Sequence, residues 1–160
     1  MENYIQLKQN DILKLGIRDE NGKDTGNVLE FDLEDIELLP RYQELVEKDK
    51  KNRSYLYNQL KILDKKQDYK KKNEILTYKE KETLKYMQDF YKKEVEIYNL
   101  FLGKDGVQKL LNGRNLNWST LEEIDTIINE SILPNLKLTE QNIREKIMKK
   151  YSKKEDDVLE

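Results

Sequence analysis

Carboxylates are the side chains best suited to chemistry in this 160-residue chain, because it contains no histidine and no cysteine. It therefore lacks the commonest general base, a cysteine nucleophile, a thiolate metal site and any disulfide. The pairs Glu94/Glu96 and Glu122/Glu123 fall at helix starts or on exposed faces, with no sign of the cleft and shifted pKa that carboxylate catalysis needs. Phosphate-binding and serine-hydrolase glycine motifs are missing. The sequence predicts a protein that is not an enzyme and has no cofactor or metal.

A basic segment is the first feature that points to binding. Residues 48–72 carry ten basic and three acidic side chains, whereas residues 1–47 carry five basic and twelve acidic ones. Tyr55, Tyr57 and Tyr69 are interleaved with the lysines, a pattern that suits phosphate neutralisation combined with base stacking. The overall net charge of −2 and the acidic residues upstream disfavour nucleic acid as the partner. A solvated helix face is the simpler interpretation, and a nucleic-acid-binding or regulatory protein is an alternative.

An aromatic cluster gives the second indication of binding. Its members lie on a predicted helix and just beyond it: Phe90, Tyr91, Tyr98, Phe101, Leu102 and Trp118. One interpretation is a core that anchors the long helix against the shorter helices after it. The other is an apolar face that holds a partner segment. We take these six residues as the candidate partner-binding site.

A β-hairpin is predicted near the N-terminus. Residues 11–18 alternate between apolar and polar side chains, and residues 27–31 read as the return strand. Between them Asn21-Gly22 is a strong hairpin signal, because both residues tolerate positive φ. The surrounding segment 19–24 superficially resembles a calcium loop but lacks the closing Glu. Tyr4-Ile5-Gln6-Leu7 is a candidate third strand, since a lone hairpin is marginal in water.

Helical periodicity dominates the rest of the chain. Asp32 is expected to cap a short helix at 33–38, and Pro40 to break it or begin the next. An apolar stripe predicts a helix over 41–72 that bends or loops near 49–52, ending in a solvated segment at 65–73. A second stripe over 75–102 ends at Gly103. The two stripes predict a long antiparallel helical hairpin.

Shorter helices are predicted to follow the hairpin. One covers 105–111 and ends at Gly113. The next begins with a capping box formed by Ser119 and Glu122 and stops at Pro134. Thr139 is expected to cap a last helix.

The predicted fold class is mainly α with a small N-terminal β-hairpin (α+β). Residues 1–39 form the β-hairpin and short helix, and residues 40–151 form the helical region of the same single domain. Residues 152–160 form a disordered tail. No apolar run approaches the roughly 20 residues that span a bilayer, and the N-terminus lacks the pattern of a signal peptide. We therefore expect a protein of the bacterial cytoplasm, without membrane partners.

The order of these elements resembles the tail assembly chaperones of long-tailed phages and prophages of low-GC Gram-positive bacteria. The resemblance covers about residues 28–136. Four short motifs carry it: Phe31-Asp32-Leu33-Glu34-Asp35 after the β element, Phe101-Leu102-Gly103 at the end of an aromatic helix, the turn Gly113-Arg114-Asn115, and Ile132-Leu133-Pro134. The basic segment 48–72 is more charged than this family leads one to expect.

The resemblance implies a non-catalytic chaperone of virion morphogenesis. Such proteins bind and solubilise the tape measure protein, which exposes apolar stripes before assembly, and deliver it to tail tube protein. Many are also made in a frameshift-extended form. A structural tail or virion subunit, with the β-hairpin pairing between copies of a homo-oligomer, is a further alternative.

Overall fold

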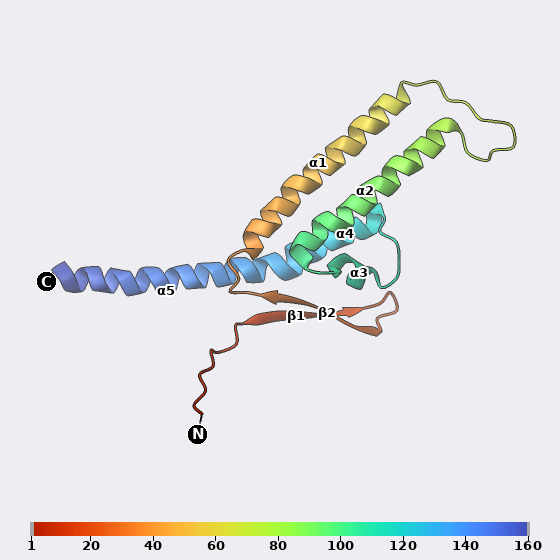
Figure 1. The fold of residues 1–160 in the computed structure, drawn as a ribbon. Helices are drawn as coiled ribbons and strands as arrows, with labels where there is room; N and C mark the ends of the chain where they lie inside the picture. Colours follow the sequence, from red (N-terminus) through yellow and green to blue (C-terminus); the bar gives the residue numbers. More distant parts are fainter. Residues whose placement is uncertain (1, 160) are drawn as a thin grey trace. The chain divides into compact units, whose positions relative to one another are not determined.

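The computed structural model describes residues 2–159, and it confirms the predicted fold class (Figure 1). Contacts divide the chain into two compact units. The first contains the residues up to Leu39 together with those from Ser119 onward, and the second is Pro40–Trp118. Residues 119–159 therefore belong with the N-terminal β-hairpin and not with the helical hairpin. Met1 and Glu160 lie outside the described residues.

The β-hairpin of the first unit consists of β1 (Ile12–Arg18) and β2 (Asp24–Asp32), which pair antiparallel. Leu13 lies opposite Phe31, and Leu15 lies opposite Leu29. Leu29 and Phe31 are each 2% exposed, whereas the intervening Glu30 is exposed. The alternation of the sequence is confirmed, because one face of the hairpin is buried and the other meets solvent.

The turn between the strands uses one positive φ instead of two. Gly22 has φ 78°, while Asn21 is not among the residues with positive φ. The Asp19 carboxylate stabilises this turn, since its Oδ1 accepts hydrogen bonds of 2.9 Å from the backbone N–H groups of both Asn21 and Lys23. An Asx-type turn therefore replaces the expected Asn-Gly geometry.

Two predictions for the N-terminal region are wrong. Tyr4, Ile5 and Leu7 form no third strand, because they are 86%, 98% and 89% exposed and have no regular secondary structure. Three apolar residues among polar neighbours bury too little surface to offset the entropy of ordering them. The short helix at 33–38 is also absent among the described elements. Asp32 Oδ1 accepts a hydrogen bond from Glu34 N–H at 3.0 Å and its carbonyl accepts one from Asp35 N–H, so this segment forms separate turns.

The second unit is built on the predicted helical hairpin, which is confirmed. Helix α1 (Leu38–Asp64) and helix α2 (Tyr78–Leu102) run side by side (Figure 1). They are antiparallel, since Tyr42 near the start of α1 packs edge-on against Phe101 near the end of α2, with ring centroids 5.4 Å apart. The interruption expected at 49–52 is wrong, because α1 is continuous there.

The loop between α1 and α2, residues 65–77, is tied to the start of α2. Asp68 Oδ1 accepts a hydrogen bond from Lys79 N–H at 3.0 Å, and Tyr69 stacks on Tyr78 with ring centroids 5.0 Å apart. At its other end α2 stops at Gly103, as predicted, and this residue has a positive φ of 92°. Helix α3 (Gly106–Leu111) follows directly.

The C-terminal helices form one uninterrupted run. Helix α4 (Trp118–Ile127) continues through the π-helical turn η1 (Ile128–Ile132) into α5 (Leu133–Leu159). Pro134 therefore does not stop the helix as predicted. The missing N–H of Pro134 falls directly after the π turn, where Leu133 N–H already reaches back to Ile128 O, and this wider turn accommodates the proline.

Both predicted ends of this run also differ. Helix α4 begins at Trp118, so Ser119 lies inside its first turn and not at the predicted cap. Helix α5 continues to Leu159 through the segment predicted as a disordered tail. Residues 152–159 contain no glycine or proline that would end a helix, which explains the continuation.

Candidate functional site

The six predicted partner-binding residues all lie in the second unit, and four of them are core residues. Phe90, Tyr98, Phe101 and Leu102 on α2 are between 1% and 4% exposed. Tyr91 is half-buried, and Trp118, the first residue of α4, is 45% exposed. The Phe90 ring lies 5.2 Å from the Tyr91 ring and 6.3 Å from the Trp118 ring, measured between centroids.

This placement separates the six residues by accessibility. Trp118 and part of Tyr91 are exposed on the surface, while the other four residues are buried within the unit. Burial raises the pKa of Tyr91, and a hydrogen bond with the Trp118 backbone partly offsets this effect. The role of the six residues in partner binding stays a prediction.

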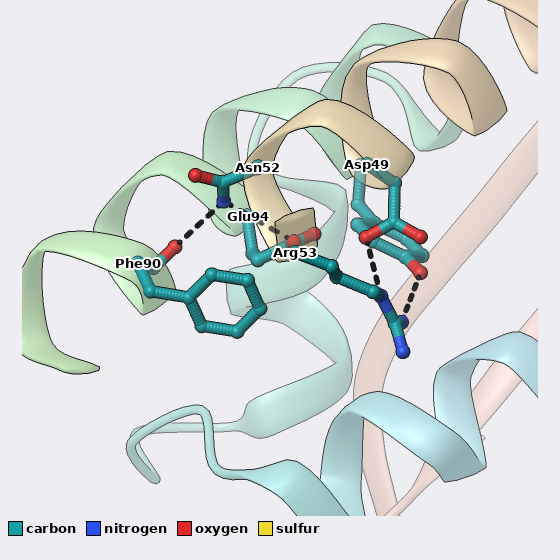
Figure 2. Close-up of polar contacts among 6 residues, drawn as sticks. Asp49, Asn52, Arg53, Phe90 and Glu94 are labelled. Carbon is teal, nitrogen blue, oxygen red and sulfur yellow. Dashed lines mark hydrogen bonds and ion pairs between the residues drawn. The ribbon is translucent and has the colours of Figure 1, made fainter. Parts of the chain in front are cut away.

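Sequence reasoning missed a polar cluster between α1 and α2, which Figure 2 shows. Glu94 on α2 is 0% exposed. Asn52 on α1 is buried too, and its Nδ2 donates hydrogen bonds of 3.2 Å to Glu94 Oε1 and to the Phe90 carbonyl oxygen. Arg53, the next residue of α1, donates a hydrogen bond of 2.9 Å from its Nε to Asp49 Oδ1, one turn earlier on the same helix. Asn52, one of the polar residues that interrupt the apolar stripe of α1, therefore has a polar partner on α2, the side chain of Glu94.

The electrostatics of this cluster favour a neutral Glu94. Burial raises the pKa of Glu94, and the hydrogen bond and negative charge of Asp49 raise it further, to about 8. The hydrogen bond from Asn52 and the positive charge of Arg53 lower this pKa in part. The Arg53 guanidinium lies 5.0 Å from the centre of the Trp118 ring. Burial lowers the pKa of Arg53, but the hydrogen bonds and charges of Asp49 and Tyr98 raise it by more. The pKa therefore lies above its usual value, and this side chain stays cationic.

An apolar groove in the first unit is the second candidate. It has a volume of about 300 Å³ and lies between one face of α5 and the segment 33–39, which comprises the turns at 33–37 and the first residues of α1. The residues of α5 that line it recur at helical spacing: Leu136, Glu140, Ile143, Arg144, Ile147 and Met148. Ile147 and Met148 are 51% and 62% exposed, and Ile36 on the opposite side is 83% exposed. Leu136 is only 2% exposed and Ile143 is half-buried, so the apolar groove residues of α5 that meet solvent lie between Ile143 and Met148.

The rim of this groove is more acidic than basic. Glu34, Asp35 and Glu140 contribute carboxylates, and Arg144 contributes one cation. A groove with an apolar floor and charged edges is a common receptor for an amphipathic helix, whose apolar residues enter at intervals of three and four. None of the six predicted residues lines it. The spacing of Leu136, Ile143 and Ile147 in the sequence is the signal that could have identified it.

The basic segment is distributed over two parts of the second unit. Lys48, Lys51 and Lys93 line a groove between α1 and α2 together with Tyr55, which is 60% exposed. Lys48 also forms an ion pair with Glu44, with 2.8 Å between Lys48 Nζ and Glu44 Oε1. Lys50 lies beside Lys51 on α1, and the remaining lysines of the segment lie near the end of α1 and in the loop 65–77. The side chains near Tyr55 are therefore one place where this segment combines cations with an accessible aromatic ring, and Tyr57, with Lys61 Nζ 5.4 Å from its ring centroid, is another.

Comparison of the chain with protein-family models, curated proteins and solved structures found no match. Separately, none of the helices in the described residues has both the length and the apolar content that crossing a membrane requires.

Proposed function

We propose that this protein is a non-catalytic tail assembly chaperone that holds an apolar helix of the tape measure protein in the groove along α5. One observation supports this most strongly: the half-buried Ile143 and the exposed Ile147 and Met148 form an accessible apolar surface in this groove, opposite Ile36. The partner's identity is an expectation that rests on the resemblance of the sequence motifs.

The physical argument begins with the partner. A long helical protein that waits for assembly exposes apolar stripes, and these stripes self-associate in water. Covering such a stripe removes apolar surface from solvent at about 25 cal/mol per Å², while the charged outer face of α5 keeps the complex in solution. The acidic rim of Glu34, Asp35 and Glu140 favours a partner helix whose apolar stripe is flanked by Lys or Arg.

Co-expression with the long helical protein encoded beside this chain tests the proposal. We expect a soluble complex that survives pulldown and size-exclusion chromatography. Ile147→Asp places a carboxylate in the groove and should abolish this complex. Asn142→Asp adds the same charge at an exposed position of α5 that does not line the groove, and it should retain the complex. A chaperone should also be missing from purified virions, whereas a structural tail subunit would remain in them.

The groove beside Tyr55 supports a second candidate, a nucleic-acid-binding protein. Lys51 and Lys93 supply phosphate-binding cations there, and the exposed Tyr55 ring supplies a stacking surface. This candidate predicts retention on immobilised single-stranded nucleic acid that weakens steeply with salt and is reduced by Lys51→Glu. If such retention occurs and no complex with the helical protein forms, the chaperone proposal is wrong.

A further inference from the structure

The buried carboxyl of Glu94 has an unusual set of neighbours. Its Oε1 accepts the hydrogen bond from Asn52, but its Oε2 is buried and has no hydrogen-bond donor. Asp49, on the facing helix, acts on this carboxyl group through a side-chain hydrogen bond and through its charge. Two ionised carboxylates cannot occupy such a site side by side without a large electrostatic cost. A proton on one of them removes the repulsion and supplies the missing donor.

We propose that Glu94 holds this proton, donates it in a hydrogen bond to Asp49, and thereby forms a pH-sensitive latch between α1 and α2. The latch is closed while the proton is bound and weakens when the proton leaves. This inference concerns the stability of the hairpin and is independent of the proposed chaperone function.

The surrounding charges explain why Glu94, and not Asp49, takes the proton. Asp49 and Arg53, both on α1, are the charged groups that act on Glu94. Arg53 forms an ion pair with Asp49, with 2.9 Å between its Nε and Asp49 Oδ1. Its guanidinium also donates a hydrogen bond of 3.5 Å to the Tyr98 hydroxyl of α2 and lies over the Trp118 ring at the start of α4. The guanidinium therefore stabilises the ionised form of Asp49, which leaves the more deeply buried Glu94 to hold the proton.

The direction of the pH effect follows from linkage. Burial, with the hydrogen bond and charge of Asp49, raises the pKa of Glu94 from 4.5 to about 8, so between these values the folded chain binds a proton that the unfolded chain has lost. The stabilisation is complete below the unfolded pKa and decreases as pH rises, until it is lost above the folded pKa. From pH 6 to pH 8 the folding equilibrium constant should fall about fiftyfold.

The composition of the chain makes this effect easy to isolate. The chain has no histidine and no cysteine, so it lacks the side chains that ordinarily titrate between pH 6 and 8. The terminal amine is the one other group with an ordinary pKa near this range. A change in stability across this interval therefore reports on Glu94.

Denaturant unfolding at pH 6, 7 and 8, followed by the fluorescence of Trp118, tests the latch. We expect the wild-type folding constant to fall about fiftyfold over this range, and Glu94→Gln to remove most of that dependence. Glu96→Gln, at an exposed position of the same helix, should keep it. A flat wild-type profile, or a Glu94→Gln profile as steep as the wild type, would overturn the proposal.

A second measurement uses the wild-type chain alone, in case Glu94→Gln does not fold. The ¹³C shift of the Glu94 carboxyl carbon, recorded against pH, should show a midpoint near 8. A midpoint below about 6 would show that Glu94 is ionised in the folded state at neutral pH and would refute the latch.

Discussion

Replacing Asn52 by Ala tests the polar cluster of the helical hairpin most sharply. Asn52 interrupts the apolar stripe of α1, so a sequence pattern alone suggests that Ala is harmless or beneficial in this helix. The structure predicts the opposite. Asn52 Nδ2 is the donor to Glu94 Oε1, and without it this buried oxygen lacks a donor. The Phe90 carbonyl also loses a hydrogen bond, although it lies within a helix and can keep its backbone partner.

The magnitude follows from the desolvated acceptor. An orphaned buried acceptor costs about 1–3 kcal/mol, so we expect the free energy of unfolding to fall by about 2 kcal/mol. For a chain of this size that corresponds to a decrease in Tm of about 4–8 °C. The hydrogen bond from Asn52 also lowers the pKa of Glu94, so its loss should move the pH midpoint of the latch upward.

Thermal unfolding by circular dichroism and denaturant unfolding by Trp118 fluorescence measure both effects. Asn58→Ala, at an exposed position of the same helix, is the matched control and should change the free energy of unfolding by less than about 0.5 kcal/mol. If Asn52→Ala is as mild as Asn58→Ala, the polar cluster does not stabilise the hairpin and the reasoning is wrong.

Two further substitutions test other parts of the second unit. A Cβ at Gly106 would lie 2.5 Å from Leu102 Cβ, so Gly106→Ala should lower the free energy of unfolding by about 1–3 kcal/mol. Gly16 has open space around it, so the control Gly16→Ala should change the free energy of unfolding little. Equal effects of the two substitutions in a denaturant titration would contradict the close approach of Gly106 and Leu102. Asp68→Ala removes the acceptor of the Lys79 N–H, so the backbone amide of Lys79 should exchange its hydrogen faster. An unchanged exchange rate would show that this hydrogen bond does not tie the loop 65–77 to α2.

The parts of the fold that could be predicted from the sequence follow from local periodicity. Alternation located β1 and β2, because one face of a hairpin must be buried. The three- and four-residue spacing of apolar residues located α1 and α2, and Gly103 located the end of α2.

The errors arose where a tertiary partner overrides a local signal. The polar residues at 49–52 read as a break, but the chain is helical there because Asn52 faces Glu94. Pro134 reads as a stop, but the π turn at Ile128–Ile132 accommodates it. Neither compensation is visible in a local window of sequence.

The candidate site shows the same limit. The aromatic residues of α2 suggested a binding face, yet Phe90, Tyr98 and Phe101 are buried in the hairpin. The accessible apolar side chains lie instead on α5, at Ile143, Ile147 and Met148, with the charged Arg144 among them. Periodicity identifies which residues share a helix face, but it does not tell which face the rest of the chain covers.

The affinity of this chain for a helical segment of the tape measure protein tests the central claim most directly. Fluorescence anisotropy with a labelled segment would compare the wild type with Ile147→Asp and with the control Asn142→Asp. Losing the burial of one large aliphatic side chain and introducing a carboxylate into the groove should raise the Kd by at least about tenfold for Ile147→Asp. Asn142→Asp should leave the Kd within about twofold. Equal affinities of Ile147→Asp and the wild type would show that the groove along α5 is not the binding site.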